Sequence, residues 1–66
     1  MEPQRRFLRL RDVQRLVPLS RSRLYELIAE GRFPAQVRLS DRASAWDSKE
    51  IEAWMAERVA ASQRPD

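Results

Sequence analysis

Apolar residues near the start of the chain recur with the spacing of a helix. From Leu10 onward they gather on one side of a helical turn, as on the buried side of an amphipathic helix. Pro18 predicts the end of that helix, because the residue before a proline is pushed out of the helical conformation. The alternation that begins at Leu8 predicts a short lead-in strand within residues 6–10. The apolar positions of the helix are Leu10, Val13, Leu16 and Val17.

A second helix is marked at both ends. Ser20 can cap its start, and Leu19 and Leu24 are placed to form a hydrophobic staple around that cap. Gly31, the only glycine in the chain, lies where a left-handed residue ends a helix without steric penalty. The helix is therefore predicted over residues 21–30. Its buried side should hold Leu24, Leu27 and Ile28, and its exposed side Arg21, Ser22, Tyr25 and Glu26, with Arg23 at the edge.

The two helices are separated only by Val17, Pro18 and Leu19, and the second is polar and rich in arginine at its amino-terminal end. This arrangement is typical of a helix-turn-helix, in which the first residues of the second helix reach the edges of DNA bases. An ordinary helical hairpin in a small bundle would have the same short connection. The two helices therefore favour DNA binding without deciding it.

The pattern then changes to strand alternation. Val37 and Leu39 would point to one side of an extended segment that covers residues 36–40. A turn at residues 40–42 and a return along residues 43–46 would close a hairpin, although it lacks the glycine usual in a tight turn. Its polar side chains could contact phosphate or enter a minor groove, while an exposed edge hairpin kept soluble by its charges fits the same residues. These side chains are Arg38, Ser40, Arg42 and Ser44.

A third helix is predicted over residues 48 to about 61. Asp47 and Glu50 have the spacing of a capping box, and Trp46 and Ile51 flank it as a staple. Both tryptophans, Trp46 and Trp54, are expected in the core, because a chain this short has few other large side chains to fill its centre. We expect residues 1–61 to form one domain and residues 62–66 to be a frayed tail. The apolar face of this helix is predicted to hold Ile51, Trp54, Met55 and Val59.

Composition removes several classes of function. The 66 residues include no Cys and no His, so the sequence predicts no disulfide framework, no metal site and no neutral-pH acid or base. A glycine-rich phosphate loop is absent too. We therefore expect no enzyme, no catalytic residue and no cofactor. No apolar stretch approaches the roughly 18 residues of a membrane span, and the start does not resemble a signal peptide, so we expect a cytoplasmic, nucleoid-associated protein with no membrane partner.

Charge is distributed unevenly. Residues 1–42 hold ten arginines against five acidic residues, for a net charge of +5, whereas residues 43–66 hold three basic and five acidic residues, for −2. A concentrated cationic face is typical of phosphate binding, and the planar guanidinium suits phosphates and guanine edges. A solvated, arginine-rich surface would give the same balance. If this charge binds phosphate, contacts are expected from the hairpin arginines, Arg38 and Arg42. Some of Arg5, Arg6, Arg9 and Arg32 would add to them.

Taken together, these motifs closely resemble the AlpA family of prophage-linked transcriptional regulators. The resemblance covers about residues 8–56 and lies in the run LSRSRLYELIAEGRFP at 19–34, then VRL at 37–39, Trp46, and EIEAWM at 50–55. More distantly related are phage excisionases and MerR-type DNA-binding domains. The resemblance implies an α+β winged helix-turn-helix, with three helices and a two-stranded β-hairpin wing between the second and third. It implies that the second helix enters the major groove and that the wing contacts the backbone or minor groove.

Carried over by position, the resemblance places a DNA-facing set on the second helix: Ser20, Arg21, Ser22, Arg23 and Tyr25. It places Arg38, Arg42 and Ser44 in or near the wing. Family wings often carry glycine at the tip, where this chain has residues 40–42, and Arg23 stands where many relatives have a small Thr or Ser. A guanine edge would be read by Arg21 or Arg23, and the residues alone leave open which of them does so.

Three functions fit these features. The first is a transcription factor that binds double-stranded DNA and controls prophage or mobile-element genes, with further copies of itself on repeated sites. The second is an excisionase that bends DNA for an integrase. The third is a protein-interaction adaptor, whose exposed apolar patch could draw only on Phe7, Phe33 and Tyr25.

Overall fold

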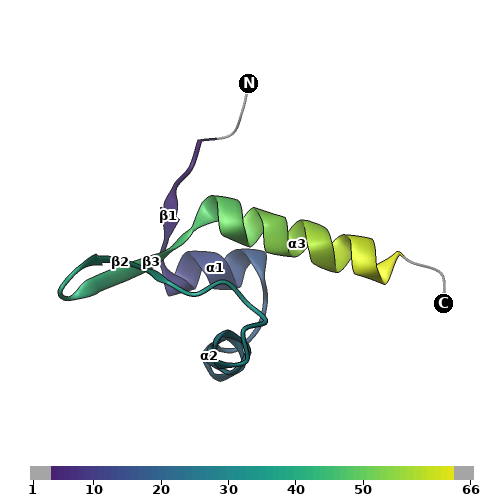
Figure 1. The fold of residues 1–66 in the computed structure, drawn as a ribbon, viewed down its shortest axis with the longest axis horizontal. Coiled ribbons are helices and arrows are strands. Elements are labelled where there is room, and N and C mark those ends of the chain that lie inside the picture. Colours follow the sequence, from purple (N-terminus) through teal and green to yellow (C-terminus); the bar gives the residue numbers. More distant parts are fainter. Residues whose placement is uncertain (1–3, 64–66) are drawn as a thin grey trace.

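Residues 4–63 are described by a computed structural model with three helices and a small three-stranded antiparallel sheet. Figure 1 shows the hairpin of β2 (Val37–Ser40) and β3 (Ala43–Asp47) and the helix α3 (Ser48–Ser62) extending in opposite directions from the middle of the molecule, where α1 (Leu10–Leu16) lies. The predicted α+β class, with three helices and a hairpin between the second and third, is confirmed. In chain order the elements are β1 (Phe7–Leu8), α1 (Leu10–Leu16), α2 (Arg21–Ala29), β2 (Val37–Ser40), β3 (Ala43–Asp47) and α3 (Ser48–Ser62).

The first helix begins and ends as its sequence predicts. At its start, the Asp12 carboxylate accepts a hydrogen bond of 3.2 Å from the backbone N–H of Arg9, one of the donors that a first turn leaves free. Its last residue is Leu16, two positions before Pro18. The Gln14 side-chain amide donates to the backbone oxygen of Leu19 at 3.3 Å. This bond braces the short connection that leads into α2.

Both predicted caps of α2 are present. The Ser20 hydroxyl accepts a hydrogen bond of 3.1 Å from the backbone N–H of Arg23. At the other end Gly31 has a φ of +72°, and its N–H donates to the Ile28 carbonyl while that of Arg32 donates to the Leu27 carbonyl. These two bonds form a Schellman motif, which needs a left-handed residue after the helix. The helix ends at Ala29, one residue before the predicted end.

The hairpin forms without a glycine at its turn. β2 and β3 are joined across Asp41 and Arg42, and in residues 4–63 only Gly31 has a positive φ. The turn is therefore not one of the left-handed types that usually close a two-residue hairpin. A register shift lies directly beside it, because Arg38 pairs with Ser44 whereas Ser40 pairs with Ala43. Such a shift is typical of a β-bulge, which increases the local twist of the strands. The turn itself is not of a type that matches this twist.

A third strand, which sequence patterning did not pair, ties the amino-terminal segment to the sheet. β3 is the central strand, with β1 on one side and β2 on the other. The backbone N–H of Arg6 donates to the Ser48 hydroxyl at 2.7 Å, and the Ser48 N–H donates to the Arg6 carbonyl at 2.8 Å. Ser48 is the one buried polar residue of the described chain. The predicted lead-in strand is therefore real, but it is limited to Phe7–Leu8.

The third helix starts at its predicted residue. The Asp47 carboxylate accepts a hydrogen bond of 2.9 Å from the backbone N–H of Lys49. The helix runs to Ser62, slightly beyond the predicted end, and Gln63 is its carboxy-terminal cap. Ser62 was predicted as the first residue of a frayed tail, and it is instead helical. The last three tail residues, 64–66, lie outside the described residues.

The core lies where α1, α2, β3 and the first turn of α3 meet. Trp46, predicted as core, is 1% exposed, and its indole N–H donates to the Pro34 carbonyl at 3.0 Å. Trp54 and Ile28, also predicted as core, are only partly buried. Trp54 lies at the edge of the core, where its N–H donates to the Arg32 carbonyl at 2.8 Å. The buried cluster consists of Leu8, Val13, Val17, Leu24, Leu27, Phe33, Trp46 and Ile51.

Three other expectations from the apolar pattern are wrong. Leu16 is 47% exposed and Val59 is 55% exposed, although both belong to predicted buried stripes. Val59 belongs to the last part of α3, and Figure 1 shows this end of the helix extending away from the other helices and the sheet. Phe33, expected as a candidate for a sticky surface, is buried and packs edge-on against Trp54 with ring centroids 4.8 Å apart.

Candidate nucleic-acid interface

The amino-terminal turn of α2 presents a polar, basic surface. Arg21, Ser22 and Arg23 are exposed, because Leu24 and Leu27 take the opposite side of the helix into the core. Ser20 precedes them and is exposed as well, although its oxygen already accepts the capping hydrogen bond. The residues at this end of α2 that were predicted to face DNA are therefore accessible to solvent.

Tyr25 links this surface to the hairpin. The Arg21 guanidinium lies over the Tyr25 ring, with its central carbon 5.5 Å from the ring centroid. The Tyr25 hydroxyl accepts a hydrogen bond of 3.0 Å from the Gln36 side-chain amide, just before β2 begins. On its inner side the ring lies 6.4 Å from that of Trp46. One tyrosine thus contacts an α2 arginine, the core and the approach to the hairpin.

Arg23 has a different environment. Its guanidinium forms an ion pair with the Glu26 carboxylate, one turn along the same helix. Both side chains are exposed. The charge of Arg23 is therefore partly neutralised within α2, whereas the partner of Arg21 is an uncharged ring.

The polar hairpin residues point to solvent. Arg38, Ser40, Arg42 and Ser44 are all exposed. The Arg38 guanidinium reaches the backbone oxygens of Ser40 and Asp41, both at 3.4 Å, and so lies across the turn. Arg38 and Ser44 are partners across the two strands, which places them on the same face of the hairpin.

A groove of about 510 Å³ connects α2 with the hairpin. It runs from Arg9, ahead of α1, past Tyr25 to Arg42 and Ser44 on the hairpin. Sequence spacing gave no reason to bring Arg9 close to the hairpin, because 32 positions separate Arg9 from residue 41 along the chain. The pairing of β1 with β3 brings the two segments together. The residues around the groove are Phe7, Arg9, Leu10, Tyr25, Gln36, Leu39, Arg42, Ala43, Ser44, Ala45 and Trp46.

The arginines of this region differ in charge compensation. Within residues 4–63, no carboxylate forms an ion pair within 4.0 Å of the guanidinium of Arg9, Arg21, Arg38 or Arg42. Other arginines are paired: Arg5 with Asp47 at 3.1 Å, Arg15 with Asp12, Arg23 with Glu26 and Arg32 with Glu30. Four arginines without an ion pair in these residues therefore lie on the groove, the hairpin and the start of α2, where they can attract a polyanion. Three other described arginines without an ion pair lie outside these elements: Arg6, Arg11 and Arg58.

Comparison with known proteins decides the family. The family model described as "Prophage CP4-57 regulatory protein (AlpA)" matches residues 6–59, which include every helix and strand except the last residues of α3. The chain belongs to the AlpA family. It is also 51% identical over 61 residues to the protein named "Uncharacterized protein ORF88" of Enterobacteria phage P4, an alignment that covers 92% of this chain and 69% of the relative. The resemblance inferred from the sequence is confirmed.

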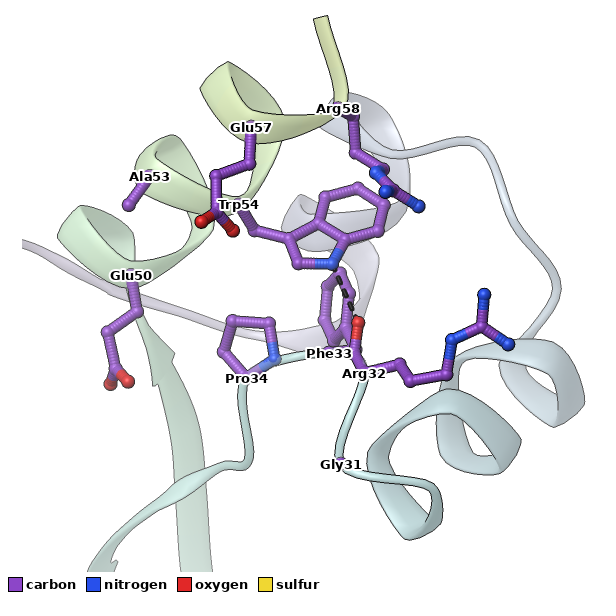
Figure 2. A pocket seen from close by; sticks show the side chains of 9 residues that line it. All are labelled: Gly31, Arg32, Phe33, Pro34, Glu50, Ala53, Trp54, Glu57 and Arg58. Carbon is purple, nitrogen blue, oxygen red and sulfur yellow. Dashed lines mark hydrogen bonds between the residues drawn. The ribbon is translucent and has the colours of Figure 1, made fainter. Parts of the chain in front are cut away.

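Arg32, one of the predicted phosphate contacts of this AlpA-family chain, lies away from the groove between α2 and the hairpin. Arg32 borders a second groove, between the loop after α2 and the first turns of α3, and its guanidinium pairs with Glu30 at 3.4 Å. Figure 2 shows the carboxylates of Glu50 and Glu57 on one side of this groove and the guanidiniums of Arg32 and Arg58 on the other. Arg32 therefore does not share the groove that joins Arg9 to the hairpin.

Gln36 is the site residue that sequence reasoning did not identify. It belongs to the extended segment predicted over residues 36–40, and no local pattern connects it with Tyr25, eleven positions earlier. The contact depends on how the loop after α2 returns to the sheet. In the described part of the chain, no group of three or more acidic, Cys or His side chains is arranged to hold a metal ion. None of the described helices combines the length and the apolar character of a membrane span.

Proposed function

We propose that this AlpA-family protein is a sequence-specific DNA-binding transcriptional regulator of prophage or mobile-element genes. In this proposal the start of α2 is a recognition helix in the major groove, and the β2–β3 hairpin is a wing on the backbone or minor groove. The observation that carries the proposal is that four arginines without an ion pair in the described chain, Arg9, Arg21, Arg38 and Arg42, lie on these two elements and on the groove between them. The family's description as a regulatory protein supports it.

The residues would divide into two kinds of contact. Side chains on the first turn and a half of α2, from Ser20 to Tyr25, would face the edges of the bases. The wing residues and Arg9 would contact phosphate or sugar and so set the position of the protein on the duplex. Because phosphate contacts release counterions, they should make binding sensitive to salt.

A salt titration with two arginine variants tests this division. Arg42→Ala should weaken binding to all sites alike and reduce the slope of log K against log salt by about 1. Arg58→Ala is the matched control, because Arg58 lies on α3 beside the second groove. It should leave the slope unchanged. DNA binding that does not respond to salt would contradict the proposal.

A domain of this size offers a small contact area, since single modules bury only about 600–1,000 Å² of protein on DNA. We therefore propose that several copies bind repeated sites. The same surfaces would serve an excisionase that bends DNA for an integrase. Genome-wide mapping of bound DNA distinguishes the two roles: sites beside promoters support regulation, and sites clustered in an attachment region support excision.

A further inference from the structure

Two arginines at the start of α2 are placed to read a base, and the structure gives them different partners. Arg23 forms its ion pair through a terminal nitrogen of the guanidinium, which points at the Glu26 carboxylate. Arg21 instead lies with its guanidinium over the Tyr25 ring. This difference in partners matters for base recognition, because the N–H groups that would bond to a base lie in the plane of the guanidinium.

Guanine is recognised by two parallel hydrogen bonds from the guanidinium edge. A cation near the face of an aromatic ring is attracted by the ring and is not paired with an opposite charge. Arg21 therefore has no carboxylate among the described residues to give up before its guanidinium bonds to a base. Arg23 must give up a bond to Glu26 before the same nitrogen can serve a base.

The ring that supports Arg21 is itself held in place. Gln36 donates to the Tyr25 hydroxyl at 3.0 Å, and the Trp46 ring lies behind Tyr25 at 6.4 Å. Trp46 is buried and is held in turn by its hydrogen bond to the Pro34 carbonyl. Tyr25 is 36% exposed, so it reaches the surface while it is anchored from below.

We infer that Arg21 is the residue that reads a guanine edge, and that Tyr25 and Gln36 are positioning residues that hold it in the reading orientation. Arg23 contributes charge, and Glu26 keeps it from competing for the base. Gln36 directly precedes β2, so the same contact couples the orientation of Arg21 to the placement of the hairpin. This inference rests on the proposed function, because it assigns a role within the DNA interface.

Base preference is the first test. For a bound site mapped as above, affinities are measured for the natural sequence and for each single base-pair change. Arg21→Ala should reduce discrimination at one guanine by roughly 5- to 150-fold, the range of one bidentate contact. Arg23→Ala should lower the affinity for every site by the same factor and leave the preference for guanine unchanged. The reverse result, with preference lost only in Arg23→Ala, would overturn the assignment.

A double-mutant cycle tests the positioning. Tyr25→Phe and Gln36→Ala each remove the same hydrogen bond, so each should reduce discrimination at that guanine by at most about tenfold. The double variant should show no further reduction, because the bond is already absent in either single variant. Additive effects, or uniform losses at every base position, would show that these residues act only on general structure.

The free protein provides a readout without DNA. Ring-current displacement of the Arg21 side-chain resonances should disappear in Tyr25→Leu and shrink in Gln36→Ala, with thermal unfolding used to check that each variant is folded. Unchanged resonances in Tyr25→Leu would overturn the positioning even if DNA binds. If the unaltered protein bound no DNA in a salt-sensitive manner, the proposed function and the reading role would both fail, while the resonances would still decide whether Tyr25 holds Arg21.

Discussion

The bond between Ser48 and the amino-terminal segment should contribute measurably to stability. Ser48 is 4% exposed, and its hydroxyl accepts the 2.7 Å hydrogen bond from the backbone N–H of Arg6. Ser48→Ala removes the acceptor and leaves that donor partly buried. A donor left without a partner costs about 1–3 kcal/mol, and the better helix propensity of Ala returns about 0.5 kcal/mol.

The net loss should therefore be about 0.5–2.5 kcal/mol of the free energy of unfolding. A domain of this size loses roughly 4–8 °C of Tm for each kcal/mol, so Tm should fall by about 2–20 °C. Thermal unfolding followed by circular dichroism measures this change. Hydrogen exchange at the Arg6 amide should also accelerate, because its protecting bond is lost.

Ser62→Ala is the matched control, since Ser62 is an exposed residue at the end of α3. It should change the free energy of unfolding by less than about 0.5 kcal/mol. If Ser48→Ala and Ser62→Ala lowered Tm equally, or if Arg6 exchange were unchanged, the bond would not hold β1 against α3 as argued.

Other substitutions test the remaining features of the fold. Gly31→Ala should cost about 1–2 kcal/mol of the free energy of unfolding, the penalty of a left-handed backbone for a residue with a Cβ. No steric clash adds to this penalty, because no atom lies within 4 Å of the added carbon. Gly31→Asn should cost less in thermal unfolding, and equal losses for the two variants would point to a clash instead. Ile51→Val should cost about 0.5–1.5 kcal/mol, whereas Val59→Ala should cost less than about 0.5 kcal/mol, since Ile51 is fully buried and Val59 is 55% exposed. Urea unfolding of the two variants measures this difference, and a large loss for Val59→Ala would show that α3 is covered in solution.

Sequence patterning predicted best where the cause of a feature lies within a few residues. The caps of α2 are set by Ser20 and Gly31, whose effects reach only three or four positions along the chain. The hairpin was predicted from alternation, although the bulge beside its turn was not. The residues of the proposed site, apart from Gln36, were also singled out from the sequence, since polar and basic residues at the start of a helix and along a hairpin are visible as a pattern.

Contacts between segments that are distant in the sequence could not be predicted without the tertiary structure. The pairing of β1 with β3, the bond between Arg6 and Ser48, and the contact of Gln36 with Tyr25 each join residues that no short-range pattern connects. The exposure of Leu16 and Val59 has the same origin, because a helical stripe shows which residues share a face but not how far another element covers it. The sequence by itself determined the three helices, the hairpin and the basic surface, because capping, periodicity and charge are local properties. Only the tertiary structure paired Arg5 with Asp47 and brought Arg9 to the hairpin, because such contacts depend on distances in space between segments far apart in the chain.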